Sequence, residues 1–138
     1  MTEKFNPFSL QGKQILVTGA SAGIGKAIAI SCAKMGANVF ITARNEKRLN
    51  DTLSEMPEKH RAVKADLTIC DDVEALIAKL PQLDGVVHCA GVGSRVPCKL
   101  ISEESITSIM KPNFDAPVLL QSALLKNKKI NKSASITF

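Results

Sequence analysis

Hydrophobic residues along the chain alternate between short continuous runs and longer stretches in which every third or fourth position is apolar. Short runs such as Ile15-Leu16-Val17 lack alternating polar partners, which is typical of strands covered on both faces of a sheet. The longer stretches are typical of helices with one buried face. Strands are predicted over 13–18, 37–42, 61–65, 83–89 and 134–138. Helices are predicted over 23–35, 45–55 and 70–80, followed by a long helix from Ser102 toward Lys128.

Strands and helices in strict alternation predict an α/β fold with a doubly wound parallel sheet. The ligand crevice of such a sheet lies at the carboxyl ends of its strands. A chain of 138 residues fits one domain with a hydrophobic core, spanning residues 1–138.

Local signals refine the predicted helix ends. Gly36 is a natural C-terminal stop for the first helix, and Thr68 with Asp71 has the spacing of a capping box before the third. Pro112 and Pro117 are expected to bend the long helix, because each removes a backbone donor and clashes with the preceding turn.

Three glycines follow the first predicted strand and open the first helix. Glycine at positions 19, 23 and 25 permits a sharp turn, close approach of backbone to a ligand, and tight packing of helix on strand. The free N–H groups of the first helical turn then suit a pyrophosphate. A phosphate loop of the nucleotide-hydrolysing type does not fit, because Ala20 and Ala27 replace its first glycine and its hydroxyl residue.

These residues resemble the short-chain dehydrogenase/reductase family. The segment 18–25 matches its signature Thr-Gly-x-x-x-Gly-x-Gly, and Asp66-Leu67 stands where the family places an aspartate over the adenine. The segment 88–91, His-Cys-Ala-Gly, stands where the family usually has Asn-Asn-Ala-Gly, and Asn113 where it has a structural and catalytic asparagine. The resemblance covers essentially the whole chain but about half of a family member, and it implies the dinucleotide-binding Rossmann domain of an oxidoreductase.

The glycine signature and the resemblance together assign a set of residues to the cofactor. They are Gly19, Ser21, Gly23, Ile24, Gly25, Arg44, Asn45, Asp66, Leu67, Cys89, Ala90 and Gly91. The resemblance further implies that Asn113 holds a water against the catalytic lysine.

Several of these positions also have purely structural interpretations. Asp66 could also start a turn, Ser21 could be a small turn residue and Arg44 a solvated loop residue, although the resemblance favours the cofactor roles. His88 is expected to be a packed, hydrogen-bonded histidine, and no partner in the sequence predicts an activated thiolate at Cys89.

The choice of cofactor depends on the end of the second strand, Thr42-Ala43-Arg44-Asn45. A site for NAD carries an acidic side chain there for the ribose hydroxyls, and this chain has none. The guanidinium of Arg44 suits a 2′-phosphate, so NADP(H) is favoured over NAD(H). Lys47 and Arg48 lie one helical turn further on and are expected to be solvated.

The chemistry of the resembled family needs a serine after the fifth strand, then a tyrosine and a lysine. This sequence ends in the predicted fifth strand and contains no tyrosine. We therefore expect the cofactor-binding part of an NADP(H)-dependent oxidoreductase acting on a carbonyl or alcohol, incomplete at its C-terminus. The alternative is a non-catalytic nucleotide-binding or interaction module.

Charge and composition add expectations about partners. The net charge of +5 is dispersed, and the densest basic run, 126–132, falls at a predicted helix end, so specific nucleic-acid binding is not expected. The run predicts weak, salt-sensitive adhesion to polyanions. No predicted span or metal-ligand spacing is present, and four scattered cysteines suggest a cytoplasmic protein without membrane contact. Ile136 and Phe138 on an unpaired edge, and the long helix, favour a homo-oligomer.

Overall fold

The protein is built on a parallel sheet whose strands all run in one direction. A computed structural model describes residues 5–57 and 59–138 of the chain. Within that part the strand order is β3-β2-β1-β4-β5, and the order reverses between β1 and β4. The strands are β1 (Gln14–Thr18), β2 (Asn38–Ala43), β3 (Arg61–Lys64), β4 (Leu83–Val87) and β5 (Ile130–Thr137). The predicted α/β class and doubly wound parallel sheet are confirmed.

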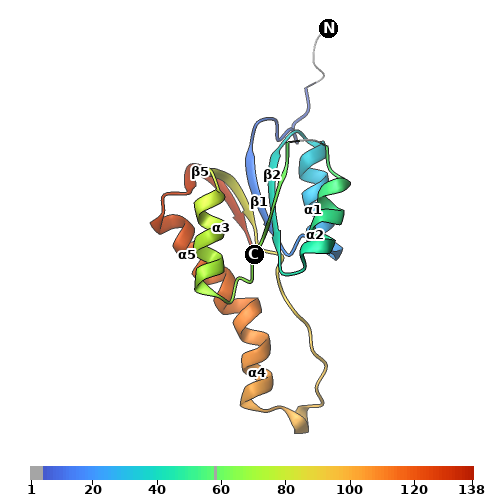
Figure 1. Ribbon diagram of the computed structural model, residues 1–138, viewed down its shortest axis with the longest axis vertical. Helices are drawn as coiled ribbons and strands as arrows, with labels where there is room; N and C mark the ends of the chain where they lie inside the picture. The colour runs from blue at the N-terminus through green and yellow to red at the C-terminus, as the bar shows by residue number, and fades with distance from the viewer. Residues whose placement is uncertain (1–4, 58) are drawn as a thin grey trace.

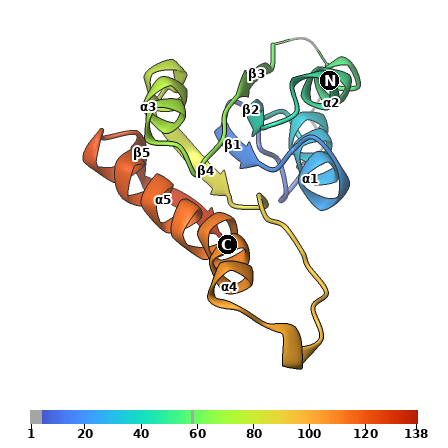
Figure 2. The same cartoon turned by 60° about the horizontal axis from the view of Figure 1, so that its bottom comes forward.

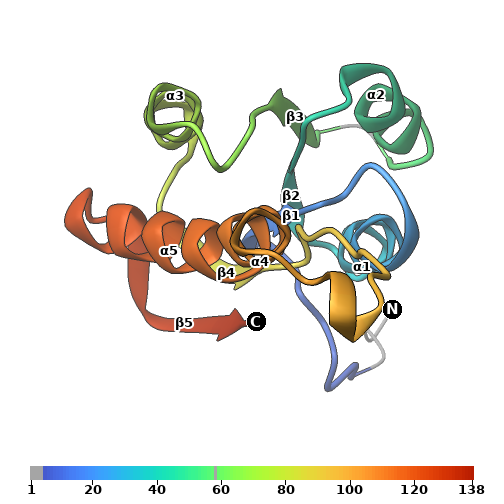
Figure 3. The same ribbon diagram turned by 90° about the horizontal axis from the view of Figure 1, so that it is seen from below.

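Helices cover both faces of the sheet, as Figures 1 and 2 show. The helices are α1 (Gly23–Lys34), α2 (Glu46–Ser54), α3 (Cys70–Lys79), α4 (Glu103–Met110) and α5 (Ala116–Lys126). In the view from below, α1 and α2 lie on one side of the sheet, with α3 and α5 on the other (Figure 3).

Two hydrophobic cores separate these layers. Leu16 of β1 packs with residues of α3 and α5, whereas its neighbours Ile15 and Val17 pack with residues of α1 and α2. Successive side chains of a strand point to opposite faces, so an unbroken apolar run is required where both faces are covered. Burial of these runs holds all the strand ends in register at one edge of the sheet.

The long helix predicted from Ser102 is interrupted. Ser102 caps α4, and the chain then makes a π-helical turn at Lys111–Asp115 before α5 begins at Ala116. Pro112 lies in that turn and Pro117 in the first turn of α5, where a missing N–H costs least. A π-helical turn therefore stands where the sequence predicted a bend.

Two predicted details are wrong. The capping box at Thr68 does not form, because Ile69 is the residue before α3 and the Thr68 hydroxyl donates to Asp66 Oδ1 at 2.7 Å. The fifth strand begins at Ile130 rather than at residue 134. The pairing register of β5 with β4 shifts between Leu83 and Gly85. Because β5 begins at Ile130, the end of the lysine-rich run belongs to this strand and not to a helix.

No helix in the described part of the chain is both long enough and apolar enough to cross a membrane.

Candidate functional site

The glycine turn between β1 and α1 is shaped by three different constraints. Gly19 has a φ of +64°, and a Cβ there would lie 2.7 Å from backbone atoms of Ala90. A Cβ on Gly25 would collide with the carbonyl of Gly19. Gly23 has a φ of +56°, but a Cβ there would meet nothing within 4 Å. Gly19 and Gly25 therefore serve packing, whereas the space beside Gly23 is open to a ligand.

Thr18 joins this turn to the end of β4. Its side chain is buried, and Oγ1 accepts hydrogen bonds from the amides of Cys89 at 3.1 Å and Ala90 at 3.0 Å. The two strand ends that flank the crevice are thereby held together by one hydroxyl. The sequence identifies Thr18 only as part of the glycine signature, because a contact across 71 residues has no local signal.

A Thr18→Val variant is expected to lose about 2 kcal/mol of unfolding free energy, because two partly buried amides lose their acceptor. Thr42→Val is the matched control. Thr42 pairs with Thr18 in the sheet register, and within residues 5–57 and 59–138 its buried hydroxyl has no partner. Denaturant titration should show Thr42→Val at least as stable as the parent; equal losses in both variants would contradict this assignment.

A cavity of about 820 Å³ opens at the carboxyl ends of the strands, beside the reversal between β1 and β4. All twelve residues predicted for the cofactor line it, and they come from the glycine turn and the ends of β2, β3 and β4. The same walls include Arg48, Thr68, Val92, Pro112 and Ala116, which the sequence did not identify. Arg48 is exposed, as expected, but it also faces this cavity.

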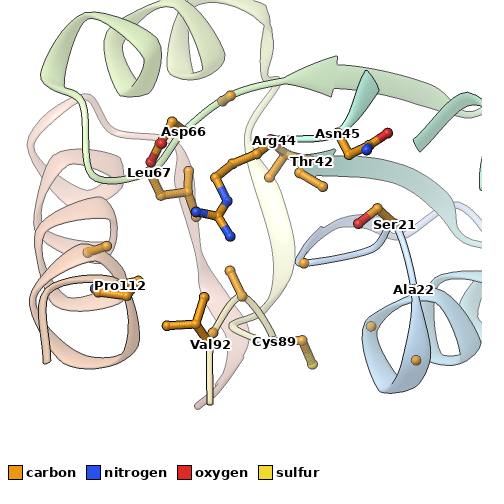
Figure 4. Close-up of a pocket in the computed structure, with 18 of the residues that line it drawn as sticks. Ser21, Ala22, Thr42, Arg44, Asn45, Asp66, Leu67, Cys89, Val92 and Pro112 are labelled. Carbon is orange, nitrogen blue, oxygen red and sulfur yellow. The ribbon is translucent and has the colours of Figure 1, made fainter. Parts of the chain in front are cut away.

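Arg44 and Asp66 give the cavity its charged wall. In Figure 4 the Arg44 side chain extends from the end of β2 into the space beside Leu67. Hydrogen bonding from the Thr68 hydroxyl, assisted by the Thr68 amide and the charge of Arg44, lowers the pKa of Asp66. A carboxylate beside a guanidinium leaves this wall with donors and acceptors for a polar ligand.

Asp66 also has the structural role considered for it. Its Oδ1 accepts bonds from the amide and the hydroxyl of Thr68, at 2.9 and 2.7 Å. Among the described residues no protein group bonds Oδ2, so one carboxylate oxygen holds the turn while the other can still meet a ligand.

Asn45 is likewise committed to local structure, because its side chain accepts a bond from the Arg48 amide at 2.9 Å and caps α2. Its backbone remains beside the cavity.

Asn113 lies next to the cavity rather than on its wall. Its amide group bonds Val92 twice, accepting from the Val92 N–H at 2.7 Å and donating to the Val92 carbonyl at 2.8 Å. A Cβ on Gly91 would lie 2.8 Å from Asn113 Oδ1. The π-helical turn thus positions an amide that clamps the loop after β4, which forms the cavity's lower wall in Figure 4.

The two residues that depart from the usual asparagines are packed side chains. His88 Nε2 bonds Gln121 Oε1 at 3.2 Å, and its ring stacks on Phe138 with centroids 4.5 Å apart. The expectation of a packed, hydrogen-bonded histidine is confirmed. Burial raises the pKa of the Cys89 thiol, so the structure offers no activated thiolate there.

Acid should destabilise the protein through His88. Burial lowers the pKa of His88, with the Gln121 bond opposing, so the folded state favours the neutral ring. The unfolded chain then binds more protons, and stability is lost as the pH falls below about 6.5, by at most about 1.4 kcal/mol per unit.

Unfolding free energies measured between about pH 7.5 and pH 5 should show this slope, and His88→Asn should flatten it. A residual slope is expected from His60, whose pKa burial also lowers. An unchanged slope in His88→Asn would show that His88 is not responsible.

Comparison with known proteins gives consistent results. The family model described as short chain dehydrogenase matches residues 13–138. The 3-ketodihydrosphingosine reductase of Mus musculus is 31% identical, over 96% of this chain and 43% of its own length. The chain spans about half the length of the curated relatives it matches.

Solved structures agree with this comparison. A dehydrogenase/reductase from Sinorhizobium meliloti 1021 superimposes with a TM-score of 0.80 at 31% identity, covering 86% of this chain and 50% of that one. L-sorbose reductase from Gluconobacter frateurii, in complex with NADPH and L-sorbose, gives a TM-score of 0.79 at 28% identity, covering 88% and 49%.

Proposed function

Because the chain belongs to the short-chain dehydrogenase family, we propose that its cavity binds NADP(H) in preference to NAD(H). The observation that carries this proposal is the guanidinium of Arg44 at the end of β2, in a wall where an NAD site would have a carboxylate. The named relative that was solved with NADPH supports the same choice.

Several features of the cavity wall support binding of such a cofactor. The open space beside Gly23 and the free amides at the start of α1 suit the pyrophosphate. Arg44 would hold the 2′-phosphate, and the free oxygen of Asp66 would meet the adenine amino group. Ile24 is 77% exposed at this edge, and a bound cofactor would cover its side chain.

We infer that the parent activity is hydride transfer between the nicotinamide and a carbonyl or alcohol. When bound, the nicotinamide supplies or accepts the hydride. Ala90 and Gly91 leave room for the ring beside β4, and Asn113 holds the adjoining loop through Val92. A small-molecule carbonyl substrate is in keeping with the reductases among the relatives.

This chain supplies the cofactor-binding part of that activity. Its 138 residues contain no tyrosine, the proton-transferring residue that the family resemblance implies. The absence of tyrosine from these 138 residues is the one observation that favours the second candidate function, a nucleotide-binding module without turnover.

Titration of the purified chain with NADPH and NADH, followed by cofactor fluorescence, tests the proposal. We expect saturable binding of both, with NADPH at least about tenfold tighter because of its additional phosphate contacts. Equal affinities would contradict the proposal that Arg44 binds the 2′-phosphate. If neither cofactor binds, the proposed function is wrong. Turnover of a carbonyl substrate by this chain would show that a residue other than tyrosine can transfer the proton.

Two further proposals concern its surroundings. All four cysteines are free thiols, which supports a reducing cytoplasmic location. Exposed apolar side chains along α4 and α5, including Ile106, Phe114 and Leu119, support self-association to a homo-oligomer. Light scattering of the purified chain would measure its mass.

A further inference from the structure

The parallel sheet gathers basic residues that the sequence disperses. All strands begin at the edge opposite the cavity, and the helices between them end there, so lysines from four segments lie along this edge. We call this face the basic edge. Its members are the exposed lysines Lys13, Lys79, Lys126, Lys128 and Lys132.

Hydrogen bonds hold the segments of the basic edge together. The Lys129 ammonium bonds the carbonyl of Leu80, next to Lys79, and Gln82 Nε2 bonds the carbonyl of Lys128 at 3.3 Å. Asp84 accepts from Asn131 Nδ2 at 2.9 Å and from the amide of Gln14, beside Lys13, at 2.8 Å. The lysines of the basic edge therefore project from one connected structure.

The carboxylate of Asp84 lies among these five lysines. Hydrogen bonds from Gln14 and Asn131, assisted by the charge of Lys13, lower the pKa of Asp84, so it stays ionised and offsets one of the five positive charges. Among the described residues the only ion pair joins Lys26 and Glu55. Lys79 and Lys126 complement helix dipoles, but Lys13, Lys128 and Lys132 lie outside helices and have no such role.

An exposed aromatic side chain stands at the border of the basic edge. Phe8 is 76% exposed in a turn that the Ser9 amide closes on the carbonyl of Asn6, and it lines a shallow pocket with Met35, which is 43% exposed. A second turn follows, in which the Lys13 amide bonds the carbonyl of Leu10. Figure 1 shows this N-terminal segment beyond the end of the sheet that lies opposite α4.

The sequence led us to expect no membrane contact, but from the placement of these residues we propose that the basic edge, with Phe8 beside it, binds the surface of an anionic lipid bilayer. Clustered lysines are attracted to acidic headgroups, and an aromatic side chain at the border provides the second, apolar contact that stable peripheral binding needs. The cavity lies at the opposite ends of the strands, so a surface-bound molecule keeps it open to solvent.

Nucleic acid fits this face less well. Phe8 is a single aromatic side chain beside this face and the run 126–132 contains none, whereas single-strand binding stacks successive bases on several aromatic side chains. The exposed face of α5 presents Val118, Leu119 and Leu125, so no basic helix is available for a groove.

Co-sedimentation with vesicles of phosphatidylcholine containing about one third phosphatidylserine tests the proposal. The whole chain should bind these vesicles at low salt, bind pure phosphatidylcholine vesicles far less, and be released as the salt concentration rises. The triple variant K126Q/K128Q/K132Q should lower the partition coefficient roughly 100-fold, at about fivefold per lysine. Phe8→Ala should weaken binding severalfold without changing its salt dependence.

The matched control is K47Q/K64Q/K99Q, which removes the same charge from three exposed lysines outside the basic edge. It should change vesicle binding less than about threefold. Equal losses in both triple variants would show that vesicle binding depends on net charge and not on the basic edge, which would overturn the proposal.

Absence of binding to the phosphatidylserine vesicles would also overturn it. Tighter binding to an oligonucleotide at the same salt, unaffected by Phe8→Ala, would assign the basic edge to nucleic acid instead. Thermal melting of each variant checks that it is folded. Because none of these residues lines the cavity, cofactor titration of the same samples tests the proposed function separately.

Discussion

A Gly23→Ala variant is expected to fold but to bind NADPH roughly 100-fold more weakly than the parent. The added Cβ meets no protein atom within 4 Å, so it enters the space proposed for the pyrophosphate. The φ of +56° makes the backbone unfavourable for alanine and costs about 1 kcal/mol of stability. Cofactor fluorescence and denaturant titration measure the two effects separately.

Gly12→Ala provides the control for backbone strain. Gly12 has a φ of +75°, and a Cβ there also meets nothing within 4 Å, but this residue lies before β1 and away from the cavity. Both variants should lose similar stability, and only Gly23→Ala should lose the cofactor. A Gly23→Ala protein with the parent's affinity for NADPH would exclude a phosphate at that position.

Arg44→Gln is expected to weaken NADPH binding roughly 30- to 100-fold while leaving NADH binding within about threefold. The reason is that only NADPH carries the 2′-phosphate that a guanidinium can bind through paired, charge-assisted hydrogen bonds. Dissociation constants for the two cofactors, measured on parent and variant, give the ratio directly.

Lys47→Gln is the matched control, because Lys47 is an exposed cation three residues from Arg44 that does not line the cavity. Its ratio of NADPH to NADH affinity should stay near that of the parent. If Arg44→Gln weakens both cofactors equally, the side chain contributes only general electrostatic attraction. The salt dependence of NADPH binding should also decrease in Arg44→Gln and remain in Lys47→Gln.

Local patterns were sufficient for most of the fold. The runs that form β1 and β2 are apolar because both faces of the sheet are covered there. The predicted bounds of β1 to β4 agree with the structure within about two residues. The fifth strand was placed four residues late, because the polar segment at Ile130 becomes a strand only by pairing with Leu83. Such a pairing between distant segments leaves no periodicity in either one.

The candidate site shows the same division. The glycine spacing and Arg44 are local signals, and the family resemblance added the ends of β3 and β4; together they predicted twelve residues that the structure brings to one cavity. Arg48 was expected to be merely solvated, and its place in the wall follows from how α2 docks on the sheet. The clamp of Asn113 on Val92 was also not predicted as a contact, because it depends on a π-helical turn meeting a loop 21 residues away.

The sequence by itself therefore determined the alternation of strands and helices, the turn for a dinucleotide and the cation beside it, because each depends on residues within about one turn of chain. Only the tertiary structure decided how Thr18 joins two strand ends, how Asp66 divides its oxygens, and how distant lysines form the basic edge. Those features arise when a parallel sheet brings all its strand starts to one side and all its strand ends to the other.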